Sequence, residues 1–144
     1  MKLWRAILLV LILALPSAGR AATDAAQLCL ALNVYHEGLK DEPIEGLFAI
    51  AQVTLNRAER KPERVCSVVQ ARSQFSWTLK PPPVEDGRPW RNAQAVARLS
   101  LHTADFTGGA THFHALYISP YWKADMEPLG QWGNHIFYKR KGKP

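Results

Sequence analysis

The stretch from Leu30 to Arg57, LALNVYHEGLKDEPIEGLFAIAQVTLNR, contains two apolar-periodic segments joined by a short charged turn. In the first segment apolar residues recur at intervals of three and four, which is the spacing of one helix face. Gly38 ends this helix. The second segment opens at Glu42-Pro43, since proline is tolerated in a first helical turn, and continues to Asn56-Arg57. The stretch therefore predicts a helix–turn–helix pair.

After this pair the sequence predicts two more helical segments and then a small β element, whereas the first helix of the pair extends to the N-terminal side of Leu30. The first helix is expected from about Ala25 to Glu37, with Thr23-Asp24 as its cap. The later elements are expected, in order, as a short helix or turn at Val65 to Ala71, a loop at Pro81 to Pro83, a helix from Pro89 to about His102, and strands at Ala110 to Ala115 and His135 to Tyr138. Tyr117 to Trp132 shows no regular period and is expected to be irregular. The predicted fold class is α+β, dominated by helix.

The chain of 144 residues is long enough for one domain with one core. Residues 1–21 have the pattern of a signal peptide: a basic start, an apolar run from Ala6 to Leu15, and Pro16-Ser17 before Gly19-Arg20-Ala21. The apolar run is much shorter than the roughly 20 residues that a membrane-spanning helix needs. We expect residues 1–21 to be removed after Ala21 during export, leaving residues 22–144 as the domain.

The formal net charge of +6 falls to +3 on removal of residues 1–21, because that segment carries three basic residues and no acid. Much of the remaining excess lies in the tail from Lys139 to Lys143. This tail is either a solvated chain end or a segment that is weakly attracted to an anionic envelope surface. No groove-reading motif is present, so nucleic acid is not expected as a partner.

Cys29 and Cys66 are the two cysteines of the chain. An even count in an exported protein predicts one disulfide between the first helix and the segment after the second. Such a bridge would contribute roughly 3–4 kcal/mol in the chain-entropy account. The alternative is a pair of buried thiols.

Glu37 is the candidate catalytic acid. It stands at a helix C-terminus, where the helix dipole does not favour a carboxylate, and partial burial would raise its pKa and make it a general acid. The alternative is an ordinary surface glutamate. No second catalytic carboxylate can be assigned from spacing.

A zinc site is the main competing chemistry. On a strand His112 and His114 would face one side and Phe113 the other, so two imidazoles could meet a metal with His135 or His36 as a third ligand. No His-Glu-x-x-His motif supports this, and no Gly-x-Ser-x-Gly motif supports a serine hydrolase. No metal or other cofactor is therefore expected.

Several motifs in one order resemble the cell-wall hydrolase family typified by the spore cortex-lytic enzyme SleB. The motifs are Ala31-Leu32-Asn33-Val34-Tyr35-His36-Glu37-Gly38, Glu42-Pro43-x-Glu45-Gly46, Ala49-Ile50-Ala51-Gln52-Val53-x-Leu55-Asn56-Arg57, Gln74-Phe75-Ser76, Gly109-Ala110-Thr111-His112-Phe113-His114, Pro120-x-Trp122 and Gly133-x-His135-x-Phe137-Tyr138. After the glutamate the sequence departs from the family's Glu-Ala-Arg-Gly-Glu-Pro pattern. The resemblance covers about Leu28 to Tyr138.

This resemblance implies a mostly helical, lysozyme-like fold and a lytic transglycosylase that cleaves the MurNAc–GlcNAc bond of peptidoglycan in the periplasm or cell wall. The matching glutamate, Glu37, would act as general acid and then as base. The other substrate-binding candidates are Gln74, Ser76, Thr111 and His112, which match family positions, together with His114 and Trp122, whose imidazole and flat ring suit a sugar. The rival functions are a zinc-dependent envelope hydrolase and a non-catalytic peptidoglycan-binding domain.

Overall fold

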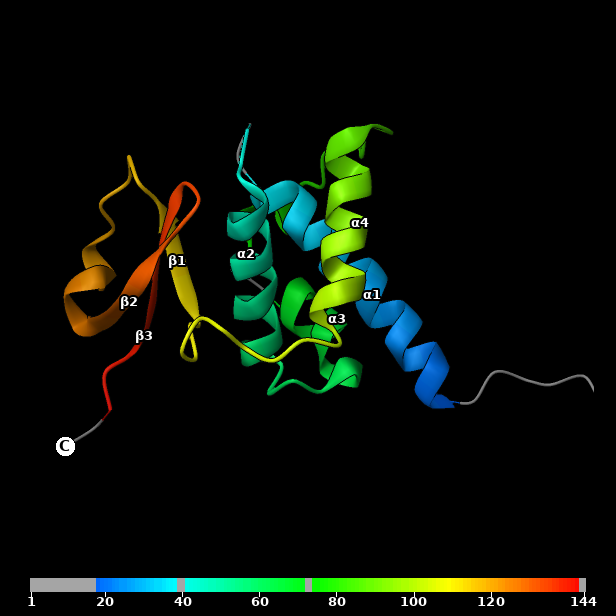
Figure 1. Cartoon of the computed structure of the whole chain (residues 1–144), viewed down its shortest axis with the longest axis horizontal. Helices are drawn as coiled ribbons and strands as arrows, with labels where there is room; N and C mark the ends of the chain where they lie inside the picture. Colours follow the sequence, from blue (N-terminus) through cyan, green and yellow to red (C-terminus); the bar gives the residue numbers. More distant parts are fainter. Residues whose placement is uncertain (1–17, 39–40, 72–73, 143–144) are drawn as a thin grey trace, which may run out of the picture.

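The computed structural model describes residues 18–38, 41–71 and 74–142, so most of the expected signal peptide lies outside the described residues. The elements are α1 (Ala18–Glu37), α2 (Ile44–Arg57), α3 (Pro62–Gln70), η1 (Ser76–Leu79), α4 (Arg88–Ser100), β1 (His112–Ala115), η2 (Tyr121–Asp125), β2 (Met126–Trp132) and β3 (His135–Arg140). The fold is the predicted α+β arrangement, with a helical layer and a small sheet late in the chain (Figure 1).

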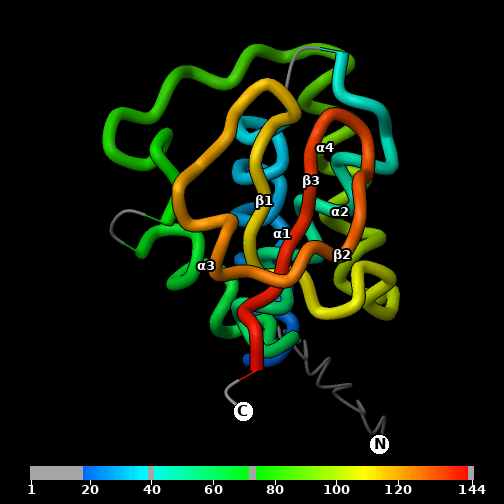
Figure 2. The backbone as a smooth tube through the Cα atoms, turned by 90° about the vertical axis from the view of Figure 1, so that its left-hand side faces the viewer, coloured from blue at the N-terminus to red at the C-terminus, as the bar shows by residue number. Residues whose placement is uncertain are grey.

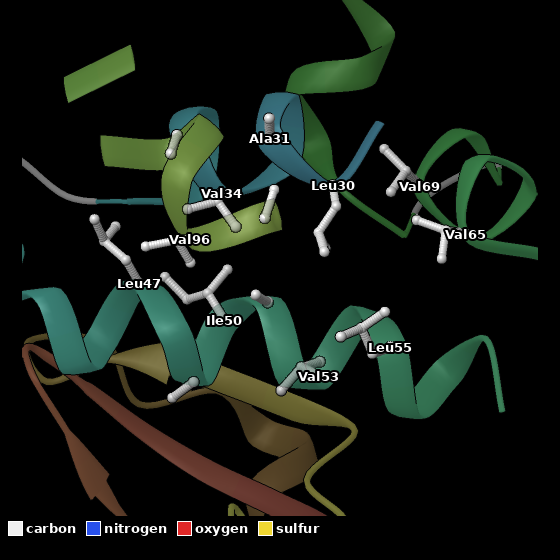
Figure 3. Close-up of a cluster of buried hydrophobic side chains, with 14 of the residues drawn as sticks. Leu30, Ala31, Val34, Leu47, Ile50, Val53, Leu55, Val65, Val69 and Val96 are labelled. Atoms are coloured by element: carbon white, nitrogen blue, oxygen red, sulfur yellow. The ribbon is translucent and has the colours of Figure 1, made fainter. Parts of the chain in front are cut away.

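Helix α2 lies between the two layers (Figure 1). Helices α1, α3 and α4 pack on one side of it and the sheet on the other, so nearly every residue from Gly46 to Leu55 is buried. Leu30 and Val34 of α1 meet Leu47 and Ile50 of α2 in the core (Figure 3). A helix that is apolar on all sides is stable only when it is enclosed in this way.

The sheet has the strand order β1-β3-β2, and both pairings are antiparallel (Figure 2). Phe113 lies opposite Phe137, which is fully buried in the core, whereas His112 lies opposite Tyr138. Since opposite residues of a ladder share a face, Phe113 points toward α2 and His112 and His114 point away from it. The predicted division of this strand into two faces is confirmed.

Two boundaries differ from the sequence prediction. Helix α1 begins at Ala18 instead of Ala25, so Thr23 is not a cap, and its hydroxyl donates to the carbonyl of Gly19 one turn earlier (3.0 Å). The segment expected to be irregular contains β2, in which the ladder register shifts between Pro128 and Gly130. This irregularity, on an edge strand that tolerates proline, removed the period of two from the sequence.

The predicted disulfide between Cys29 and Cys66 is present and joins α1 to α3 (Cα–Cα distance 5.3 Å). It crosslinks residues 37 apart in sequence. Its stabilisation on the chain-entropy account is roughly 3–4 kcal/mol. The helical layer is therefore fixed covalently as well as by its core.

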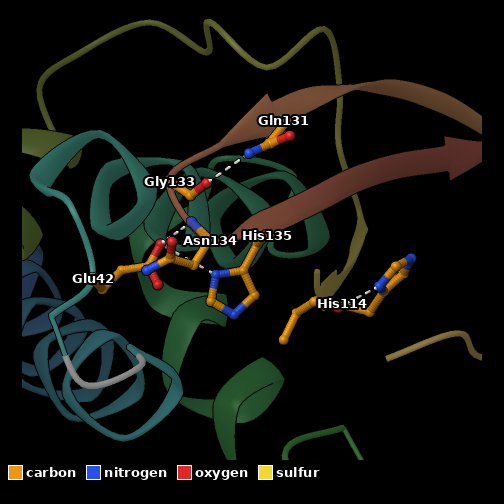
Figure 4. A network of polar contacts seen from close by, with 7 residues as sticks. Glu42, His114, Gln131, Gly133, Asn134 and His135 are labelled. Atoms are coloured by element: carbon orange, nitrogen blue, oxygen red, sulfur yellow. Dashed lines mark hydrogen bonds and ion pairs between the residues drawn. The ribbon is translucent and has the colours of Figure 1, made fainter. Parts of the chain in front are cut away.

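A buried acid links the N-terminal end of α2 to the turn between β2 and β3 (Figure 4). Glu42 Oε1 accepts hydrogen bonds from the backbone N–H of Asn134 (3.0 Å) and from Nδ1 of His135 (3.2 Å). The side chains of Glu42 and His135 are 1% and 3% exposed. Removing one partner of such a pair leaves the other polar group buried alone, which typically costs about 3–5 kcal/mol.

The turn that meets Glu42 requires glycine at position 133. Gly133 has φ of +57°, and a Cβ there would collide with Glu42 Oε1 and lie 3.0 Å from the Cα of Gly46. Gly109 also has a positive φ, of +87°, but a Cβ there would meet nothing within 4 Å. The two positions thus share a backbone requirement and differ in packing.

We expect Gly133→Ala to lower the free energy of unfolding by about 3 kcal/mol or more, because the left-handed backbone cost adds to a steric clash. Gly109→Ala should cost only about 1–2 kcal/mol, from the backbone alone. Urea unfolding of both variants and the wild type would measure the difference. Equal losses would contradict the close packing of Glu42 against Gly133.

Candidate active site

Glu37 is the last residue of α1, and the residue one turn earlier on the same face is Asn33, which is fully buried. The Asn33 side chain donates to Oγ1 of Thr54 on α2 (3.0 Å) and accepts from Nε1 of Trp77 in η1 (3.0 Å). These two bonds fix the orientation of the last turn of α1 relative to α2 and η1. The same helix face ends at the Glu37 carboxyl group.

Burial raises the pKa of Glu37 from its ordinary 4.5 to about 7, although the nearby positive charge of Arg57 acts to lower it. Desolvation is therefore the larger effect at this position. A carboxyl group with this pKa is partly protonated at neutral pH, as a general acid requires. The sequence-based expectation for Glu37 depended on such partial burial.

Arg57, the last residue of α2, is the charged neighbour of Glu37. Its Nε donates to the carbonyl of Thr111 (2.6 Å), and its guanidinium lies over the ring of Phe75 at 5.1 Å from the centroid. Burial lowers the pKa of Arg57, and the Glu37 carboxylate opposes that shift. Arg57 thus connects the acid on α1 to the segment that enters β1.

Aromatic side chains pack around the residues just before Glu37. The rings of His36 and Trp77 stack with their centroids 4.5 Å apart, and burial lowers the pKa of His36. Tyr35 meets the edge of Trp90 at 5.7 Å, and its hydroxyl accepts from the backbone N–H of Glu85 (3.1 Å). The segment from Trp77 to Glu85 is therefore held against the end of α1.

A cavity of about 450 Å³ opens beside Arg57, between α3 and the sheet. It is lined by Arg57, Val68, Ala71, Gln74, Thr111, His112, Lys139 and Arg140. Three of the predicted substrate-binding residues, Gln74, Thr111 and His112, thus line one cavity. Oγ1 of Thr111 lies 2.9 Å from Nδ1 of His112, and burial, followed by the charges of Arg57 and Arg140, lowers the pKa of His112.

A larger cavity, of about 800 Å³, lies on another side of the last turn of α1. Its lining residues are Val34, Tyr35, His36, Gly38, Asp41, Glu42, Leu47, Arg88, Pro89, Asn92 and Ala93. The neighbours of Glu37 in sequence, His36 and Gly38, border this cavity, and its charged neighbour Arg57 borders the smaller one. Glu37 itself is not among the lining residues of either cavity.

The other predicted substrate-binding residues lie outside these cavities. Ser76 is exposed at the start of η1. His114 is buried, with Nε2 2.9 Å from the Tyr138 hydroxyl and Nδ1 2.8 Å from the carbonyl of Ala115. The ring of Trp122 packs against His112, His114 and Tyr138 on the outer face of the sheet. His114 and Trp122 therefore support the sheet beneath His112.

The histidines are not arranged as the zinc alternative requires. His112 and His114 are on the outer face of the sheet, whereas His135 is opposite Ala115 on the inner face and bonds to Glu42. Within residues 18–38, 41–71 and 74–142, no three His, Cys, Asp or Glu side chains are grouped to hold a metal ion. The described donor set thus does not fit zinc.

Sequence reasoning missed the role of the basic residues around the smaller cavity. Arg57 was predicted only as a helix end and part of a family motif. Lys139 and Arg140 were placed in a tail that was either solvated or attracted to an anionic surface, whereas both belong to β3 and line the cavity. Alternation along β3 was the available signal, since Tyr138 and Arg140 share the face of His112. The signal was weak because the predicted strand ended at Tyr138.

The helical layer and the small late sheet define an α+β domain dominated by helix. Residues 41–138 match the sequence profile of the Cell Wall Hydrolase family, and since this is more than half of the chain, the protein belongs to that family. It is therefore a cell-wall hydrolase. The matched range begins after Glu37, so family membership does not depend on that residue.

Two solved structures have a similar fold. The catalytic domain of the germination-specific lytic transglycosylase SleB from Bacillus anthracis is 23% identical, with a TM-score of 0.64 over 87% of this chain and 100% of that domain. The catalytic domain of the Bacillus cereus SleB protein is 25% identical, with a TM-score of 0.59 over 80% of this chain and 91% of the other. A search among curated proteins gave no match.

The burial of Glu37 has a consequence for stability. Because its pKa is higher in the folded chain than the ordinary 4.5, folding is favoured at low pH, and this contribution is lost as the pH rises through about 7. At pH 8 we expect Glu37→Gln to be more stable than the wild type, by up to about 3 kcal/mol. The difference should disappear below about pH 4.5.

Urea unfolding at both pH values would test this expectation. Glu45→Gln is the matched control, because Glu45 is exposed in the first turn of α2 and its replacement should have little effect at either pH. Equal stability of Glu37→Gln and the wild type at pH 8 would show that the Glu37 carboxyl group is not desolvated.

Proposed function

We propose that the protein cleaves the bond between MurNAc and GlcNAc in peptidoglycan as a lytic transglycosylase, with Glu37 as its single acid and base. The observation that carries the proposal is the pKa of Glu37, which burial at the end of α1 raises to about 7 beside Arg57. Membership of the cell-wall hydrolase family supports the substrate. The similar Bacillus anthracis domain is itself described as a lytic transglycosylase.

The reaction returns the acid to its starting state without consuming water. Protonated Glu37 donates its proton to the glycosidic oxygen as the bond from C1 of MurNAc to that oxygen breaks, which gives GlcNAc a free hydroxyl. The Glu37 carboxylate then accepts the proton of the muramyl 6-hydroxyl as that oxygen bonds to C1. The product is a 1,6-anhydromuramyl end, and Glu37 is protonated again.

The acids near Glu37 in sequence favour this single-carboxyl scheme. A glycosidase that uses water normally needs two carboxyl groups facing the scissile bond. Glu42 is committed to Asn134 and His135, with its side chain 1% exposed. Asp41 and Glu45 are exposed at the start of the α2 segment. Glu42 is thus held in a structural contact through Oε1, and the scheme gives Asp41 and Glu45 no part in the reaction.

We assign the sugar-contacting roles according to position. Gln74, Thr111 and His112 line the cavity beside Arg57 and would contact the glycan there. Exposed Ser76 adjoins this group through Gln74 and Phe75. His114 and Trp122 would act through His112, because they pack beneath it on the sheet.

We also propose that the protein works outside the cytoplasm, in the periplasm or the cell wall, after removal of residues 1–21. Cleavage after Ala21 would shorten α1, which begins at Ala18, by about one turn. The described helices include none that is both long enough and apolar enough to cross a membrane. The basic end of the chain would add a weak attraction to anionic envelope surfaces.

Product analysis tests the reaction directly. We expect the wild type to release anhydromuropeptides from purified peptidoglycan, and Glu37→Gln to lower the rate by at least about a thousandfold, because the amide can neither donate nor accept the proton. Glu45→Gln should retain activity. Mass spectrometry of the soluble products would contradict the scheme if it found reducing ends, and products from neither protein would favour a non-catalytic peptidoglycan-binding domain.

The pH dependence tests the protonation state of Glu37. Since the acid must be protonated and its pKa is about 7, kcat/KM should fall roughly tenfold per pH unit above that value and level off below it. Initial rates on solubilised glycan strands between about pH 5 and pH 9 would give this profile. A rate that increases with pH through 7 would mean that the ionised carboxylate is the starting form.

A further inference from the structure

The smaller cavity carries an excess of positive charge. Its lining includes Arg57 from the end of α2 and Lys139 and Arg140 from the end of β3, but no aspartate or glutamate. Nζ of Lys139 lies 3.5 Å from Glu127, so this charge is partly compensated. Arg140 forms no ion pair with any residue of the described ranges. Two cations from different elements thus face one cavity without an acid between them.

The guanidinium of Arg57 retains an unused donor. Its Nε is bonded to Thr111, but its NH1 atom is buried and has no partner among the residues that the structure describes. A buried donor on a charged group is costly to leave unpaired. An acceptor that enters the cavity could satisfy it.

His112 lies within electrostatic reach of both cations. Burial, and then the charges of Arg57 and Arg140, lower the pKa of His112, so both cations act on the same part of the cavity. The neutral imidazole adds no positive charge of its own, and with Gln74 and Thr111 it supplies uncharged hydrogen-bonding groups. This combination suits a small anion attached to a polar chain.

We propose that this cavity is a carboxylate-binding subsite for the glycan strand, with Arg57 and Arg140 as its cations and Gln74 and Thr111 as its polar neighbours. The inference rests on the proposed function, because muramic acid carries a carboxyl group on the sugar ring whose C1 reacts. The guanidinium fork of arginine matches a carboxylate. Arg57 also lies within electrostatic reach of Glu37, so the bound carboxylate would place the sugar next to the acid.

Two parts of the substrate can supply this carboxylate. In strands without peptides the lactyl ether of muramic acid ends in a free carboxylate, whereas in intact strands that group is an amide and the carboxylates belong to the stem peptide. Peptide-free strands, the same strands with the lactyl group converted to a methylamide, intact strands and free stem peptide separate these sources.

Calorimetric titration of the chain carrying Glu37→Gln with these ligands tests the inference without cleavage. We expect the methylamide strands to bind about tenfold more weakly than the free-carboxylate strands, because a charge-assisted hydrogen bond is lost. A second change, Arg140→Gln, should remove most of this preference. Arg57 is a poorer test position, because it also anchors Thr111.

Arg98→Gln is the matched control. Arg98 is exposed in the last turn of α4, so this substitution removes the same charge at a position away from the cavity. It should keep the tenfold preference. Preferential binding of intact strands and of free stem peptide would assign the carboxylate to the peptide, and preferential binding of peptide-free strands would assign it to the lactyl group.

The inference is overturned if methylamide strands bind as tightly as free-carboxylate strands and as intact strands, with no binding of free stem peptide. It is also overturned if Arg140→Gln and Arg98→Gln weaken binding to the same extent. Its failure is distinguishable from failure of the proposed function. Absence of cleavage by the wild type with the preference retained would reject the reaction and keep the subsite. Cleavage with no preference would reject the subsite and keep the reaction.

Discussion

The enclosure of α2 between the helical layer and the sheet is the constraint on which the rest of the structure depends. Apolar packing along the middle of the helix sets how deeply it is buried, and polar groups at its two ends attach the sheet to it. At one end Glu42 binds the turn between β2 and β3, and at the other Arg57 binds Thr111 before β1. The sheet is therefore held at two separated points, and the smaller cavity lies beside the second.

Sequence periodicity predicted most of the fold because α1, α2 and α4 each bury one continuous set of apolar residues. The disulfide was predicted from the even number of cysteines and the expected export to an oxidising compartment. The two faces of β1 were predicted from the alternation of side chains along a strand. The strand β2 could not be predicted, since Pro128 and Gly130 interrupt both its period and its ladder. The start of α1 was missed because Ala18 to Ala21 also fit the end of a leader.

The candidate site was predictable only in part. Its place at a helix C-terminus made Glu37 a candidate, and the resemblance to the family motifs made it the principal one. Its environment depends on Trp77 and Arg57, which come from distant parts of the chain. The role of Glu42 was hidden for a similar reason. Its partner His135 is 93 residues away, and no local pattern distinguishes a buried acid from an exposed one in a charged turn.

The sites at which α2 is joined to the sheet have a consequence for the order of assembly. Chains fold largely from the N-terminus as they emerge, and contacts between distant residues form late. The helical layer can form from residues up to Ser100. Glu42 can pair only after His135 has been synthesised, and the smaller cavity is complete only after Arg140 has been synthesised. Until nearly the whole chain is available, a helical intermediate would contain Glu37 but not the residues of the sheet that line the smaller cavity. Completion of the site is thus coupled to completion of the polypeptide.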